Sequence, residues 1–319
     1  MNWDNYALIF HRPLGDRGED SYGYSFERFD FHALAVFDGC GGSGAWKYPE
    51  FDNATGAFVA AHTTAPKFLD WFDSLDADAV NDPAALAENL RAYTSDVLTG
   101  LKEYCSTMGI VGGLVKSFPC TAACALVTDS PTGGIRLTAL NAGDSRVYCL
   151  TPAEGLVQVT HDDSRGNPDP LDALRSNPPL SAMLNADKPY CFTATQLDLA
   201  SPCAVLSASD GIFGFVRSPM DFEYMLLDAL MRSDSIHGFE ENFQQAVTRV
   251  TGDDSTCVMS FYGFNGYEAI RRKMTPRYEM IRALVQRLDA IPDAAERDAE
   301  MRRVWEDYRK QTLYYEKVG

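Results

Sequence analysis

The sequence predicts an α+β sandwich in which two mostly antiparallel β-sheets pack together with helices outside. Many short strand-like runs are separated by turn residues, two long helical patterns interrupt them, and strands and helices then return. The chain has 319 residues, of which 45% are hydrophobic and 23% charged, so it can bury a large core. We expect one domain over residues 1–265 and a helical C-terminal extension over residues 266–319.

The elements follow from local patterns along the chain. The expected strands lie at residues 6–10, 22–26, 31–37, 121–128, 135–141, 146–150, 156–160, 191–197, 203–209 and 256–262. The expected helices lie at residues 55–74, 83–108, 219–231 and 238–250, and Pro83 after Asn81-Asp82 is typical of a helix start. Residues 162–190 are rich in turn-forming residues and predict a long loop, which in a compact domain is often functional.

The C-terminal extension has apolar residues at helical spacing. Tyr267, Met274, Ile281 and Leu288 recur every seven residues, and a second stripe includes Trp305. The pattern predicts helices broken at Thr275-Pro276 and at Ile291-Pro292. We expect the stripe to be covered by the rest of the chain. Because the catalytic motifs are complete by Asp254, we also expect the extension to be dispensable for chemistry. The alternative is a hairpin that docks a partner or forms a dimer.

Acidic residues at strand ends predict a site at one edge of a sheet. Asp38 and Asp210 each end an apolar run and are followed by glycine, and Asp254 opens the last expected strand. Together with the pair Glu19-Asp20, these carboxylates would repel one another and would need cations between them. Oxygen ligands without paired His or Cys favour Mg²⁺ or Mn²⁺ over Zn²⁺.

A plainer interpretation exists for each motif taken alone. Asp-Gly is a common turn dipeptide, so each one singly favours a turn over a ligand. Gly143-Asp144-Ser145-Arg146 lies between two strands and favours a tight turn in which Asp144 and Arg146 pair locally. The five histidines, His161 among them, show no metal-ligand spacing, and the eight cysteines favour buried free thiols.

The order of the motifs carries more information than any single motif. They are Glu-Asp, Val-Phe-Asp-Gly-x-Gly-Gly, Thr-Ala-x-x-Ala-Leu-Val, Asn-Ala-Gly-Asp-Ser-Arg, Ala-Ser-Asp-Gly and Asp-Asp-Ser-Thr. In this order they resemble the metal-dependent serine/threonine protein phosphatases of the 2C type (the PPM family), over roughly residues 5 to 264. The resemblance implies a four-layer sandwich of two sheets flanked by helices.

The resemblance also implies a two-metal site and a reaction. Two Mn²⁺ or Mg²⁺ ions would be held, directly and through water, by Glu19 or Asp20, Asp38, the carbonyl of Gly39, Asp210 and Asp254. A hydroxide that bridges the ions would attack phosphoserine or phosphothreonine in a protein substrate. Asp38 and Asp210 would then be catalytic as well as metal-binding.

Three positions depart from the family pattern. Cys40 stands where family members usually have a His that protonates the leaving group, so Cys40 is the candidate proton donor. The usual phosphate-binding Arg is replaced by Gly15, and Arg12 or Arg17 on either side could substitute for it. Lys116 stands where some relatives carry an Asp for a third metal, so we expect two ions.

Charge and composition narrow the class of protein. The formal net charge is −17, which argues against nucleic acid and anionic membranes as partners. The sequence shows no apolar span or leader and predicts a cytoplasmic enzyme. The expected function is a divalent-metal-dependent protein phosphatase. The alternatives are a pseudophosphatase that binds a phosphorylated partner without efficient turnover and, less favoured, a hydrolase of small phosphate esters.

Overall fold

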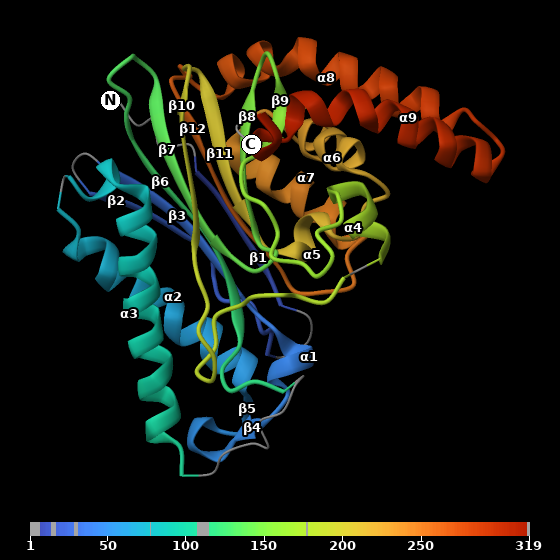
Figure 1. The fold of residues 1–319 in the computed structure, drawn as a ribbon. Coiled ribbons are helices and arrows are strands. Elements are labelled where there is room, and N and C mark those ends of the chain that lie inside the picture. Colours follow the sequence, from blue (N-terminus) through green and yellow to red (C-terminus); the bar gives the residue numbers. More distant parts are fainter. Residues whose placement is uncertain are drawn as a thin grey trace.

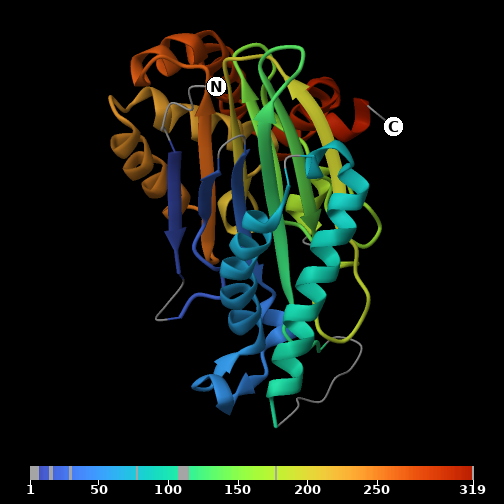
Figure 2. The same ribbon diagram turned by 90° about the vertical axis from the view of Figure 1, so that its left-hand side faces the viewer.

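The predicted four-layer α+β sandwich is confirmed. The computed structural model describes residues 7–13, 17–28, 31–76, 78–106, 115–176 and 178–317. They form two five-stranded sheets packed face to face, with helices on both outer faces (Figures 1 and 2).

The strands follow the expected order along the chain. They are β1 (Ala7–Arg12), β2 (Tyr24–Arg28), β3 (Phe31–Gly39), β6 (Cys120–Asp129), β7 (Ile135–Ala142), β8 (Arg146–Thr151), β9 (Gly155–Gln158), β10 (Thr193–Leu199), β11 (Cys203–Ala208) and β12 (Ser255–Tyr262). One sheet has the order β1-β12-β11-β8-β9 and the other β10-β7-β6-β3-β2, with antiparallel pairing in both. A separate small sheet pairs β4 (Lys47–Tyr48) with β5 (Ala54–Thr55).

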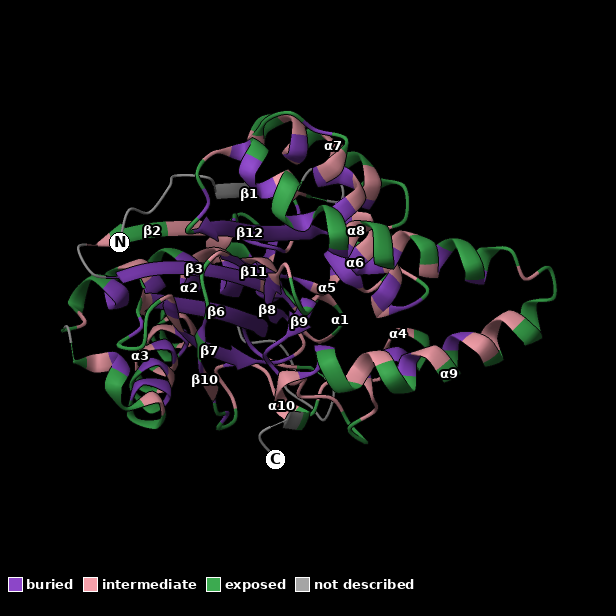
Figure 3. Cartoon of the chain, turned by 90° about the horizontal axis from the view of Figure 1, so that it is seen from above, coloured by how far each residue is buried: buried purple, intermediate pink, exposed green. Residues whose placement is uncertain are grey.

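The alternation of side chains along β3 shows how the layers are joined. Ala35 and Phe37 face the helices that cover their sheet, whereas Leu34 and Val36 face the second sheet. All four side chains are buried, so β3 reads as a continuous apolar run, as expected for a strand covered on both faces. Figure 3 shows the buried strands enclosed between partly exposed helices.

Several helices begin at capping residues that the sequence supplies. Asp82 accepts a hydrogen bond from the Ala85 N–H at 3.0 Å ahead of Pro83, and Ser218 caps the helix that starts at Pro219 in the same way. The helices are α1 (Gly41–Gly44), α2 (Gly56–Ser74), α3 (Pro83–Tyr104), α4 (Pro170–Ser176), α5 (Asp210–Phe213), α6 (Pro219–Met231), α7 (Ile236–Thr248), α8 (Tyr267–Asp289), α9 (Ala294–Thr312) and α10 (Tyr314–Lys317). Short 3₁₀ turns lie at Pro49–Phe51 and Ala79–Asn81. None of these helices has the length and hydrophobicity that crossing a bilayer requires.

The C-terminal helices pack against the rest of the chain. Met274, Ile281, Leu288 and Trp305 are buried in the same apolar cluster as α6, α7 and the outer face of the β12 sheet. The cluster also encloses a charged contact, because the Arg277 Nε donates to Glu223 of α6 at 2.5 Å with both side chains almost fully buried. The stripe predicted from the sequence is therefore covered within the chain itself.

Two local predictions were wrong. Helix α8 continues through Pro276 without a break, because Met274 and Arg277 on either side are buried and the Thr275 hydroxyl donates to the Arg271 carbonyl at 2.8 Å. The predicted break at Ile291-Pro292 is confirmed between α8 and α9. The expected loop 162–190 contains the helix α4, and its Asn177 lies outside the described residues, as do residues 107–108 of the expected helix 83–108.

Candidate metal and phosphate site

The carboxylates at the strand ends meet at one edge of the sandwich, where Asp38, Asp210 and Asp254 border the same cleft. Asp38 is the penultimate residue of β3, Asp210 begins α5 directly after β11, and Asp254 immediately precedes β12. The register explains part of this placement, because Ala208 at the end of β11 pairs with Cys257 near the start of β12 and so brings Asp210 and Asp254 to the same edge. Asp38 comes from the other sheet. The predicted convergence of these side chains is present in the described structure.

Asp20 is a buried member of the group. Its side chain is 1% exposed and accepts a hydrogen bond from the Ser209 Oγ at 2.8 Å. Burial, with the nearby charge of Asp210 adding to it, raises the pKa of Asp20 to about 7. The choice between Glu19 and Asp20 as a metal ligand stays a prediction, since Glu19 lines the cleft and Asp20 is buried beside Asp38.

Mutual repulsion also acts on the other acidic side chains. The pKa of Asp38 is raised well above its usual range, first by burial and then by the charges of Asp20, Asp210 and Asp144. Burial, followed by the charge of Asp253, raises the pKa of Asp210 to about 6. These groups cannot all be ionised at neutral pH in the absence of compensating positive charge.

Glu19 and Asp254 form the outer part of the group. The backbone N–H of Glu19 donates to the Asp254 Oδ2 at 2.5 Å, and the Thr55 hydroxyl donates to the Glu19 Oε1 at 2.6 Å. Burial is the main reason that the pKa of Glu19 is raised. A side chain at Gly211 would overlap the Asp254 carbonyl, so this close approach of two backbones requires glycine.

The donor set fits hard divalent cations. Holding several ionised carboxylates together in a buried site is unfavourable, and bound divalent cations would remove that cost. In the described part of the chain, no three His, Cys, Asp or Glu side chains already close around a single point. Mg²⁺ usually keeps several waters and takes one or two carboxylates, so Asp38 and Asp210, which line the same cleft, suit such an ion.

A cleft of about 840 Å³ opens over this group. Its lining includes Glu19, Asp38, Gly39, Cys40, Asp144, Asp210, Asp253 and Asp254, together with Lys116, Arg165 and Lys188. The Cys40 backbone N–H donates to the Pro119 carbonyl at 3.1 Å, which fixes the residue directly after β3. Burial, and next the charge of Asp38, raises the pKa of the Cys40 thiol well above its usual range, so the thiol keeps its proton at neutral pH.

Asp144 is a site residue that the sequence analysis missed. It lines the cleft and lies close enough to raise the pKa of Asp38. The predicted local pair with Arg146 is not the arrangement found, since the Arg146 guanidinium donates to both oxygens of Asp162 at 2.6 and 2.8 Å and lies 4.2 Å from the Phe213 ring centroid. The sequence of the turn alone does not show that Asp144 lies at the same end of the sandwich as Asp38.

Neither arginine expected to bind phosphate lines the main cleft. Arg17 is exposed, donates to the Asp52 carbonyl at 3.1 Å and borders a neighbouring hollow of about 330 Å³ that also contains Glu19. Arg12 ends β1, and none of the described residues accepts a hydrogen bond from its buried Nη1. Gly15 lies outside the described residues. A phosphate-binding role for either arginine stays a prediction.

Solved structures with this fold are serine/threonine phosphatases. Phosphatase Stp1 from Staphylococcus aureus matches with a TM-score of 0.60 at 19% identity, over 80% of this chain and 94% of that chain. PstP/Ppp from Mycobacterium tuberculosis matches at 0.55 and 20% identity, over 80% of this chain and 96% of that one. The PPM Ser-Thr phosphatase MsPP from Mycobacterium smegmatis, solved with cacodylate, matches at 0.53 and 15% identity over 80% and 96% of the two chains.

These matches establish the fold. No protein-family model and no curated protein matches the sequence. The chain therefore has the fold of the PPM-type phosphatases, and the family resemblance predicted from its motifs is confirmed at that level.

Proposed function

We propose that the chain is a metal-dependent phosphatase that hydrolyses phosphoserine or phosphothreonine in proteins. The observation that carries the proposal is the convergence of Glu19, Asp38, Asp210 and Asp254 on one cleft. The PPM-type fold supports the same conclusion, because its solved examples are serine/threonine phosphatases. When bound, two Mn²⁺ or Mg²⁺ ions supply the water activation and charge neutralisation of two-metal phosphatases.

The residues of the chain then have distinct parts in the reaction. Asp38 and Asp210 would hold the ions, with Asp20 or Glu19, Asp254 and the Gly39 carbonyl completing the ligands. The Ser209 hydroxyl orients Asp20 by donating to it at 2.8 Å. Cys40 borders the cleft and retains its proton, which supports a role in donating a proton to the departing alkoxide.

The test is the variant Asp210→Asn, compared with Asp96→Asn on the exposed face of α3 as a matched control. We expect Asp210→Asn to abolish Mn²⁺-dependent hydrolysis of a phosphothreonine peptide and of an aryl phosphate, and to weaken Mn²⁺ binding in calorimetry. The control should retain both. Unchanged Mn²⁺-dependent turnover in Asp210→Asn would contradict the two-metal assignment.

The same assays separate the alternatives. A wild-type chain that binds Mn²⁺ and the phosphopeptide but hydrolyses neither substrate would be a pseudophosphatase. A chain that hydrolyses only the aryl phosphate would act on small phosphate esters. Efficient turnover of the peptide supports the protein phosphatase.

A further inference from the structure

Three basic side chains share the cleft with the carboxylates. Lys116, Arg165 and Lys188 all border it, and we call them the cationic rim. They come from loop segments, whereas Asp38 and Asp210 come from strand ends. The cleft thus combines an acidic metal-binding group with basic groups on the loops around it.

Arg165 is carried by a loop that the structure ties to the acidic group. The Arg165 backbone N–H donates to the Pro179 carbonyl at 2.9 Å, and the Ser181 N–H donates to the Asp163 carbonyl at 2.7 Å. The side chain of Asp163 accepts from the Gly143 N–H at 2.9 Å. Because Gly143 directly precedes Asp144, these bonds fix the backbone of Arg165 close to the cleft floor.

The other two basic residues are joined through Asp187. The Asp187 Oδ2 accepts from the Ser117 N–H at 2.6 Å, so the segment that carries Lys116 is bonded to the one that carries Lys188. The Asn185 side chain also accepts from the Lys188 N–H at 2.8 Å. Hydrogen bonds therefore fix the backbone segments that carry the three residues of the cationic rim.

Basic side chains that form no ion pair are informative in a chain with an excess of acidic residues. The chain contains 45 acidic and 28 basic residues, so carboxylate partners are plentiful. Many basic side chains of the described residues have one, as with Lys102 and Asp187 at 2.7 Å. Within the described ranges, Arg165 and Lys188 form no ion pair and are exposed in the cleft. Their charges are available to a ligand that enters it.

We propose that the cationic rim recognises acidic residues flanking the phosphorylated residue of a protein substrate. This inference rests on the proposed function and names its substrate class. With the phosphate at the carboxylate group, the neighbouring residues of the peptide pass over the loops that carry Arg165 and Lys188. Acidic flanking residues would be attracted there and basic ones repelled.

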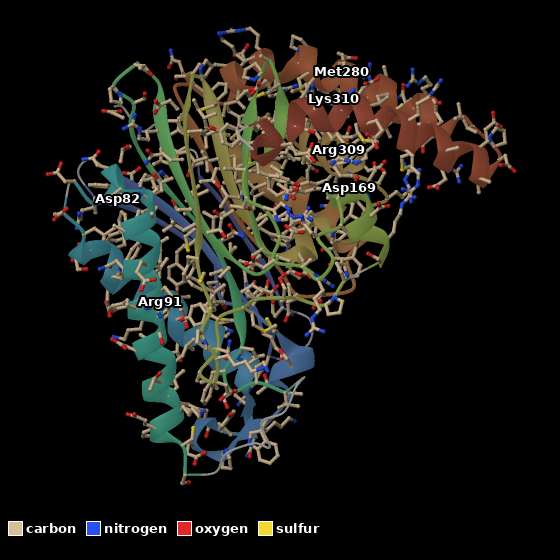
Figure 4. The ribbon with its side chains drawn as sticks, viewed as in Figure 1. Asp82, Arg91, Asp169, Met280, Arg309 and Lys310 are labelled. Atoms are coloured by element: carbon tan, nitrogen blue, oxygen red, sulfur yellow. The ribbon has the colours of Figure 1, made fainter. Side chains whose placement is uncertain are left out.

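The experiment compares two phosphothreonine peptides, one flanked by Glu and one by Ala, with an aryl phosphate that has no flanking residues. We measure kcat/KM for the wild type, Arg165→Gln, Lys188→Gln and the double variant. Lys310→Gln, on the exposed surface of α9, is the matched control (Figure 4). For the Glu-flanked peptide we expect a loss of roughly two- to fivefold for each charge removed, as for an exposed ion pair.

The preference for the Glu-flanked over the Ala-flanked peptide should fall in the variants, remain in the control, and weaken in high salt. Equal losses on all three substrates would show that the rim binds the phosphate itself and would overturn the inference. So would the absence of a preference for the Glu-flanked peptide in the wild type.

Binding separates this inference from the proposed function. If the wild type hydrolysed none of the substrates, the proposed function would fail, and fluorescence anisotropy with the labelled peptides would still test the rim. Tighter binding of the Glu-flanked peptide, lost in the Arg165→Gln/Lys188→Gln variant, would support recognition. Equal binding of the two peptides would overturn it.

Discussion

The buried carboxyl of Asp20 predicts that the metal-free protein loses stability as the pH rises. The folded-state pKa is about 7, about three units above that of an unfolded Asp. The folded state therefore binds more protons than the unfolded state between about pH 4 and pH 7, and the free energy of unfolding falls across that window. At ~1.4 kcal/mol per unit the loss is roughly 4 kcal/mol.

The variant Asp20→Asn isolates this contribution. Asparagine keeps an oxygen that can accept from the Ser209 hydroxyl, and it removes the charge that burial and Asp210 disfavour. Burial lowers the pKa of His32 to about 4, so His32 makes the free energy of unfolding rise with pH. This contribution is the same in the wild type and in Asp20→Asn. The difference between wild type and variant therefore reports Asp20 and the carboxyls coupled to it.

Urea unfolding in EDTA at pH values from 4 to 8 measures the difference. Between pH 4 and pH 8, we expect the free energy of unfolding of Asp20→Asn to rise by up to roughly 4 kcal/mol relative to that of the wild type. The free energy of unfolding of Asp96→Asn should change with pH as that of the wild type does. Mn²⁺ at about a hundred times its Kd should stabilise the wild type by about 2.7 kcal/mol. Parallel curves for wild type and Asp20→Asn in EDTA would refute the reasoning.

Two further predictions concern the proton donor and the C-terminal helices. Cys40→His should accelerate phosphopeptide hydrolysis more than aryl phosphate hydrolysis. Proton donation is worth about 10²–10⁴-fold in rate and matters most when the leaving group is a strongly basic alkoxide. Equal effects on kcat for the two substrates would show that Cys40 is not at the position of the proton donor. Arg277→Met should cost about 3–5 kcal/mol in urea unfolding, because it leaves the buried Glu223 without a positive charge and with the Tyr308 hydroxyl as its remaining partner, and Arg277→Met/Glu223→Leu should recover most of the loss. A double variant as unstable as the single one would contradict this account.

The strands and the acidic group could be predicted because both depend on local patterns. Apolar runs bounded by turn residues marked β3, β11 and β12, and antiparallel pairing of β11 with β12 brings Asp210 and Asp254 to one edge. Asp38 ends a strand of the other sheet, so its place beside them depends on the packing of the two sheets. Asp144 does not, since the same Gly-Asp-Ser-Arg sequence would form a turn at either end of a sheet.

Contacts between distant segments account for the other differences. Arg146 pairs with Asp162 and not with Asp144, and no local pattern identifies such a partner. Pro276 is tolerated inside α8 because tertiary burial on both sides outweighs the lost backbone bond. The basic residues of the cleft were not predicted as a group, since loops far apart in the sequence bring Lys116 and Arg165 together.

The expectation that the C-terminal extension is dispensable for chemistry stays a prediction, and the contacts of α9 argue against it. The Trp305 Nε1 donates to Asp169 at 3.0 Å, and Arg309 pairs with the same carboxylate at 2.8 Å (Figure 4). Asp169 directly precedes α4, in the loop that also carries Arg165. Because α9 holds this loop by two contacts to one side chain, its removal would release the segment that positions Arg165 at the cleft as well as uncover the apolar cluster.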